Sequence, residues 1–245
     1  MTADVTQLWR HPIKSHGREA VQTVTVNPWQ TMPGDRVWAV AHEASKADGS
    51  DWVPCANFSR AAKAPMLMAI STQSDGDRLT LSHPNRPDLT FAPDTEQQVF
   101  LDWVKPLMPE DRVASARVIR VPGRGMTDSD FPSISLCNTA THRAVAQKLD
   151  QDLSIHRWRG NIWFEGPPLW EEFEWIGREV QIGAAVFRVR DRITRCMATT
   201  ANPETGERDA DTLGALETWG HQDFGVYAEV LKGGEISVGD KVELL

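Results

Sequence analysis

The stretch "FGVYAEVLKGGEISVGDKVELL", Phe224–Leu245, predicts two or three short β-strands joined by tight turns. The turns fall at Gly233-Gly234 and at Gly239-Asp240, where glycine gives the backbone the freedom that a reversal of direction needs. Short strands separated by such turns are typical of sandwiches and barrels rather than of helical bundles.

Further strand-like segments lie upstream of this stretch and share its β-branched and aromatic character. They are Ala20–Val26, Arg36–His42, Arg112–Val121, Val180–Arg192 and a hairpin around the Asp-Gly turn of Thr72–Asp77. Val121–Ser133 is loop-like. Many short strands, many turn residues and few helices predict a mainly β fold with a few helices (α+β), of barrel-like architecture.

Helical patterns are few. Asp94–Lys105 has helical spacing, and Thr95 with Gln98 suits a capping box. Asn138–Leu149 predicts a second helix, with Asn138 or Thr139 as its N-cap. In "DADTLGALETW" (209–219) we expect an aspartate to cap a short third helix rather than to contact a substrate.

The composition excludes several classes of function. The 245 residues carry a net charge of −8, which argues against a nucleic-acid-binding protein. We also expect no membrane association, because no apolar run has the length of a membrane span and the beginning of the chain lacks a signal-peptide core. The three cysteines are far apart and form no CxxC, which argues against a disulfide framework and favours the cytoplasm.

Cys196 is the first candidate for chemistry, in "ITRCMATTANPETGERD" (193–209). Cations lower the pKa of a thiol, and Arg190, Arg192 and Arg195 all precede it closely. In a continuous strand Arg190 and Arg192 would share its face. A small buried core cysteine fits the spacing equally well. His221 and Asp223 could complete a Cys/His/Asp set, although no local signature supports one.

Two polar segments are candidates for binding an anion. "HPIKSHG" (11–17) combines Lys14 and Ser15 with a glycine, although a solvated loop lysine explains Lys14 as well. "HRWRGN" (156–161) alternates Arg157, Arg159 and Asn161, and its alternative is an exposed sheet edge. Arg36, at the start of a predicted strand, is ambiguous by itself.

Together these motifs occur in an order that resembles one family. "HPIKSHG", "GDRVW", "RWRGNIWFEG", "RCMATTANPETGERD" and the C-terminal stretch resemble the MOSC family with its N-terminal β-barrel domain, particularly the amidoxime-reducing branch. The resemblance covers nearly the whole chain. It implies an N-terminal β-barrel-like domain at 1–110 packed on a MOSC β-barrel domain at 111–245.

The resemblance also implies a cofactor, molybdenum carried on molybdopterin. Cys196 would be the catalytic residue and the thiolate ligand of the metal, as suits a soft ligand. The residues implied to hold the pterin and its phosphate are Lys14, Ser15, Arg36, Asn138, Arg159, Asn161 and Thr194. For Asn138 and Thr194 the match to the family's motifs is less specific than for the other residues.

Two departures from the family pattern qualify the resemblance. His11 stands where relatives usually carry an aromatic residue before the Pro-x-Lys run. "WVPCANFSRAAKAP" (52–65) matches only loosely, so a substrate-facing wall is expected to differ. We also expect no cysteine-rich ferredoxin-like domain of the kind that some relatives carry. We therefore expect electrons from a separate donor protein that carries flavin, haem or iron–sulfur.

The leading hypothesis is a cytoplasmic molybdenum oxidoreductase that reduces N-hydroxylated or N-oxide-type small molecules. The alternative is a sulfur carrier or transferase that holds a persulfide on Cys196, because MOSC domains also resemble the C-terminal part of molybdenum cofactor sulfurases. A third reading is a cofactor-carrying or substrate-binding module without turnover. Whether the protein is an enzyme is therefore left open.

Overall fold

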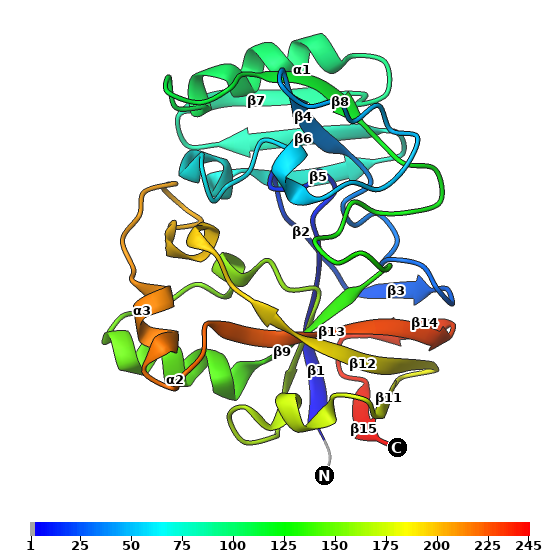
Figure 1. Ribbon diagram of the computed structural model, residues 1–245. Helices are drawn as coiled ribbons and strands as arrows, with labels where there is room; N and C mark the ends of the chain where they lie inside the picture. The colour runs from blue at the N-terminus through cyan, green and yellow to red at the C-terminus, as the bar shows by residue number, and fades with distance from the viewer. Residues whose placement is uncertain (1–2) are drawn as a thin grey trace.

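The computed structural model describes residues 3–245, and its largest element is an eight-stranded sheet. β1 pairs with both β15 and β10, so seven of the strands close into a barrel and β2 lies outside the closure (Figure 1). In sheet order the strands are β10 (Ile162–Glu165), β9 (Ile134–Asn138), β13 (Asp223–Lys232), β12 (Ala185–Thr194), β11 (Glu179–Ile182), β15 (Lys241–Leu244), β1 (Ala3–Arg10) and β2 (Glu19–Val21).

Alternating side chains fill the barrel. In β12, Ala185, Phe187 and Val189 are fully buried, whereas Arg188 and Arg190 face outward. This period of two is the property of a half-buried strand. The strand-like segment Val180–Arg192 is a hairpin of β11 and β12 rather than one strand, because the chain reverses at Gly183, whose φ is +55°. The mainly β, barrel-like fold predicted from the sequence is confirmed.

A second layer lies beside the barrel and has its own core (Figure 1). Its strands are β4 (Ala39–His42) paired with β8 (Ser115–Ile119), and the sheet of β5 (Ser71–Asp75), β6 (Arg78–His83) and β7 (Arg86–Phe91). α1 (Gln97–Val104) packs on this layer through Phe100, which stacks on Phe91 at 5.1 Å between ring centroids. The predicted hairpin over Thr72–Asp77 is confirmed as the β5–β6 pair.

Some predictions from local sequence patterns were wrong, because contacts with distant parts of the chain determine where those strands begin and end. Ala20–Val26 is not one strand: it divides into β2, which pairs with β1, and β3 (Thr23–Val26), which pairs with β14 (Gly234–Ser237). Arg36 does not begin a strand but has a φ of +51°. The capping box is absent, because Glu96 is the N-cap residue of α1 and makes no side-chain cap.

Helices and helical turns complete the chain. α2 (Thr139–Leu149) begins at Asn138, whose side chain accepts from the backbone N–H of Ala140, and α3 (Thr212–Glu217) begins at Asp211, whose carboxylate accepts from Gly214. Both predicted caps are confirmed. The short 3-10 turns are η1 (Cys55–Asn57), η2 (Pro65–Ala69), η3 (Lys105–Leu107), η4 (Ile155–Trp158), η5 (Glu171–Trp175) and η6 (Met197–Thr200).

The two halves of the chain share strands. β1 and β2, from the first 21 residues, hydrogen-bond into the barrel that residues after 133 otherwise form. The division of the chain at residue 110 stays a prediction. Within residues 3–245, none of the helices has the length and apolar character that crossing a membrane requires.

Candidate functional site

A cavity of about 240 Å³ gathers polar side chains from both halves of the chain. Most of the residues that the sequence singled out line it: Lys14, Ser15, Arg36, Arg159, Asn161, Thr194 and Cys196. Its wall also includes residues that the sequence analysis did not assign to a site, among them Arg60, Asp128, Ser135, Arg195 and Tyr227. The structure therefore brings together motifs that lie as far apart in the chain as "HPIKSHG" and "RCMATTANPETG".

Cys196 is exposed and lies two residues after the end of β12, where it is the N-cap residue of η6. Its backbone carbonyl accepts from the N–H of Thr199, which fixes the turn while leaving the thiol free to face a ligand. Cys137, in contrast, is fully buried, and burial raises the pKa of its thiol to about 12. Of the two, Cys196 is suited to reaction or metal ligation.

Among the three arginines that precede Cys196, Arg195 lines the cavity. Its guanidinium donates to the carbonyls of Trp158 at 2.7 Å and of Phe224 at 2.9 Å. Arg190 pairs with Glu229, and Arg192 lies over the ring of Phe173, so neither faces the thiol. The shared face expected for a continuous strand is lost because register shifts interrupt β12 and the strand ends at Thr194.

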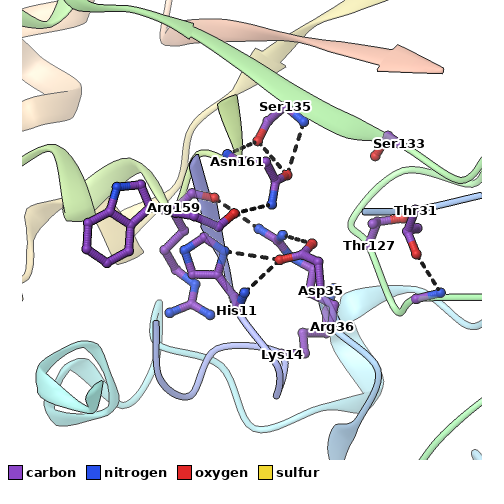
Figure 2. A network of polar contacts seen from close by, with 12 residues as sticks. His11, Lys14, Thr31, Asp35, Arg36, Thr127, Ser133, Ser135, Arg159 and Asn161 are labelled. Atoms are coloured by element: carbon purple, nitrogen blue, oxygen red, sulfur yellow. Dashed lines mark hydrogen bonds and ion pairs between the residues drawn. The ribbon is translucent and has the colours of Figure 1, made fainter. Parts of the chain in front are cut away.

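Two cations of the site, Lys14 and Arg36, are neutralised by carboxylates. Figure 2 shows the second of these contacts, between Arg36 and Asp35. The ammonium of Lys14 is 2.6 Å from a carboxylate oxygen of Asp128 and donates to the carbonyl of Met126 at 2.7 Å. Arg36 forms an ion pair with the buried Asp35, which also accepts from the backbone N–H of His11 at 2.8 Å. Asp35 was missed in the sequence, although it directly precedes Arg36 in "GDRVW".

Arg159 has no carboxylate within ion-pairing distance among residues 3–245. Its Nη1 donates to the carbonyl of Gly17 at 3.0 Å, while its Nη2 is buried without a hydrogen-bond partner. Burial, together with the charge of Arg36, lowers the pKa of Arg159 to about 9. An anion beside it would supply the missing acceptor and favour the charged form.

Asn161 and Thr194 line the cavity but already have protein partners. The Asn161 side chain accepts from the Ser135 hydroxyl at 2.9 Å and donates to the carbonyl of Trp9 at 3.2 Å, which ties β9 to β1. The Thr194 hydroxyl donates to Asp223 at 2.6 Å. Both side chains hold the cavity wall in place.

Asn138 does not line the cavity. Besides capping α2, its amide donates to the buried carboxylate of Glu172 at 2.9 Å. Burial raises the pKa of Glu172, so the contact stabilises an otherwise costly group. The ring of His221 packs against Trp170, with 4.7 Å between the ring centroids, and His221 does not line the cavity. The predicted set of Cys196, His221 and Asp223 is therefore not assembled in the cavity.

The lining as a whole carries a strong excess of positive charge. Asp128 is the carboxylate among the lining residues, against the cations Lys14, Arg36, Arg60, Arg157, Arg159 and Arg195. Within residues 3–245, no group of three or more His, Cys, Asp or Glu side chains is placed to hold a metal ion. The cavity therefore suits an anionic ligand, and a metal there would need further ligands that such a ligand brings with it.

Two family models match the chain, one after the other. The model of the MOSC N-terminal β-barrel domain matches residues 2–114, and the model of the MOSC domain matches residues 124–243. Mitochondrial amidoxime-reducing component 1 of Mus musculus is 25% identical over 98% of this chain and 82% of its own length, and that of Homo sapiens is 24% identical over the same shares.

Two further likenesses are partial or distant. A molybdenum cofactor sulfurase of Caenorhabditis briggsae is 31% identical over 47% of this chain and 17% of its own length. The crystal structure of the YUAD protein from Bacillus subtilis superposes with a TM-score of 0.52 over 100% of this chain and 96% of that one. At 12% identity, that likeness concerns the fold alone.

Proposed function

Because the chain belongs to the MOSC family and carries a MOSC N-terminal β-barrel domain ahead of its MOSC domain, we propose that it is a molybdenum-cofactor oxidoreductase that reduces N-hydroxylated or N-oxide-type small molecules. One observation carries the proposal: a cation-rich cavity combines an exposed thiol, Cys196, with a buried guanidinium nitrogen of Arg159 that has no partner. The near full-length likeness to amidoxime-reducing components supports the choice of reaction.

The donors in the cavity fit molybdopterin. Its phosphate is an anion of the kind that the guanidinium of Arg159, the ammonium of Lys14 and the hydroxyl of Ser15 recognise. The charge of Arg36 is balanced by Asp35, and its contribution is positional: its Nη2 donates to the carbonyl of Arg159 at 3.1 Å, which holds the Arg159 backbone in place. Cys196 would supply the thiolate, a soft ligand suited to a heavy transition metal. When bound, molybdenum would supply two-electron redox chemistry.

Reduction of an N–OH group to N–H consumes two electrons and two protons and releases water. Two lining residues of the chain are placed to hold or pass protons. Burial raises the pKa of the Tyr227 hydroxyl to about 12, so it keeps its proton at neutral pH. Desolvation acts to raise the pKa of Asp128, but the charge and hydrogen bond of Lys14, together with the charges of Arg36 and Arg159, hold this pKa below its usual range, so Asp128 is an ionised acceptor.

The electrons would come from a separate donor protein with a flavin, haem or iron–sulfur centre. Within residues 3–245 no cluster of ligating side chains is available for a second redox metal. The substrate would be a small molecule.

The proposal is tested by metal and pterin analysis of protein made in a host that synthesises molybdopterin. We expect stoichiometric molybdenum in the wild type and its loss in Cys196→Ser. Cys55→Ser is the matched control, because Cys55 lines the same cavity and should leave the metal content unchanged. Absence of molybdenum from the wild type, or its retention in Cys196→Ser, would contradict the assignment.

A sulfur carrier is the second candidate, favoured by the likeness to a molybdenum cofactor sulfurase and by the exposure of Cys196. Incubation with a cysteine desulfurase and cysteine, followed by mass spectrometry, would then add the mass of sulfur to Cys196. If the thiol alkylates readily yet never gains sulfur, this alternative fails.

A further inference from the structure

Arg60 is a cavity cation outside the set assigned to the cofactor. It belongs to residues 52–65, the segment that matches the family pattern only loosely. Its backbone is fixed, because its carbonyl accepts from the N–H groups of Lys63 and Ala64 at 2.9 Å each, and its neighbours Ser59 and Ala61 are buried. The side chain therefore starts from a rigid base.

The guanidinium of Arg60 is short of partners. Its Nη1 donates to the sulfur of Cys55 at 3.3 Å, and sulfur is a weak acceptor. No carboxylate of residues 3–245 lies within ion-pairing distance of it, whereas Lys14, Arg36 and Arg157 each have one. A guanidinium has five N–H donors, so most of the recognition capacity of Arg60 is open to a ligand.

The wall that carries Arg60 is attached to the turn that carries Cys196. Arg208 donates to the carbonyl of Ala62 at 2.9 Å and to the hydroxyl of Thr200 at 2.5 Å, which bridges this wall to η6. In addition, Gly206 lies directly against Met66, where a Cβ would be 2.6 Å from the Met66 Cα. Arg60 and Cys196 thus line one cavity from two segments that are held together.

We propose that Arg60 is an anion subsite for the substrate, which selects small molecules that carry a carboxylate in addition to the reducible N–O group. A planar guanidinium fork binds a carboxylate through two parallel hydrogen bonds. This inference rests on the proposed reductase function, which supplies the expectation that the substrate also carries a reducible N–O group. A substrate carboxylate and the cofactor phosphate are both anions that Arg60 could bind, and the test distinguishes between them.

The experiment compares binding of benzamidoxime and 4-carboxybenzamidoxime to oxidised holoenzyme by calorimetry, with no electron donor present and hence no turnover. We expect the wild type to prefer the carboxylated compound and Arg60→Gln to lose about tenfold of that preference. Arg60→Lys should retain part of it, because it keeps the charge but not the fork. Arg112→Gln, a change at an exposed arginine, should keep the wild-type ratio.

The outcomes are separable. An unchanged preference in Arg60→Gln overturns the subsite. Loss of molybdenum and pterin from Arg60→Gln also overturns it, because Arg60 would then hold the cofactor phosphate. Should the reduced wild-type enzyme convert neither compound, the proposed reductase function fails, while the two dissociation constants still decide whether Arg60 binds the carboxylate.

Discussion

Two groups of cations in the same cavity differ in how their charge is balanced. Lys14 and Arg36, the neutralised pair, each contact a carboxylate of the chain. Arg159 and Arg195, the open arginines, hydrogen-bond to backbone carbonyls instead. A buried charge without a counter-charge is costly, so the open arginines reveal where an anionic ligand contributes to the stability of the complex. The charges of the neutralised pair are balanced by the chain itself, whether or not a ligand is bound.

The largest expected effect is on the neutralised pair. Asp35→Asn removes a buried carboxylate and leaves Arg36 without its counter-charge, so the free energy of unfolding should fall by about 3 kcal/mol. Urea denaturation measures this loss. Asp4→Asn is the control, because its pair with Lys241 is exposed and its loss should cost less than about 1 kcal/mol. Equal losses of unfolding free energy in the two variants would show that the buried ion pair of the neutralised pair contributes no more to stability than an exposed one.

Acid should destabilise both regions through buried neutral histidines. The ring Nδ1 of His16 contacts the Lys14 carbonyl at 2.7 Å and its Nε2 has no partner, whereas His142 accepts from the indole of Trp158 at 3.0 Å. Burial lowers the pKa of each to about 4. The unfolded chain therefore binds protons that the folded chain does not, and stability falls as the pH decreases from about 6.5 to about 4.

At about pH 5, each histidine should remove about 2 kcal/mol of the stability present at neutral pH. Urea denaturation at neutral and acidic pH measures the change. His16→Gln should reduce the dependence of the unfolding free energy on pH by the contribution of the histidine beside the neutralised pair. His142→Gln should reduce it by the contribution of the histidine beneath Trp158. A slope that neither substitution alters would assign acid sensitivity to other groups.

The smallest effect on stability is expected at an open arginine. Arg159→Gln should change the free energy of unfolding by less than about 1 kcal/mol, because it removes an unbalanced charge together with its hydrogen bond to Gly17. The pterin content of purified protein should nevertheless fall about tenfold or more, with partial recovery in Arg159→Lys. A stability loss as large as that of Asp35→Asn, with pterin retained, would make Arg159 a structural residue.

The sequence predicted what local patterns determine. Alternation and glycine turns led to the β-rich fold. Side-chain chemistry predicted a cap at Asn138 or Thr139 and a second at an aspartate of 209–219, and the structure has them at Asn138 and Asp211. What failed depends on distant contacts. The pattern of Ala20–Val26 is continuous, yet its two halves pair with strands from opposite ends of the chain.

The candidate site shows the same limit. Lys14, Ser15, Arg159 and Cys196 were singled out by residue type and resemblance, and they line one cavity. Asp35 and Arg60 were not, because a counter-charge and an open guanidinium are recognised only by what lies around them in space. Asn138 was singled out and lies elsewhere, since the same amide chemistry serves a helix cap.

The pairing of β1 bears on the order in which the molecule assembles. Ala3 lies opposite Val242 and Leu8 opposite Ile162, so the barrel closes only after β15 has been synthesised. The β5–β6–β7 sheet, whose strands are neighbours in sequence, needs no such wait. Because Lys14 follows β1 and Cys196 follows β12, the cavity comes into existence at barrel closure. We therefore expect any cofactor to be loaded as the final step of maturation, into a chain that has already folded.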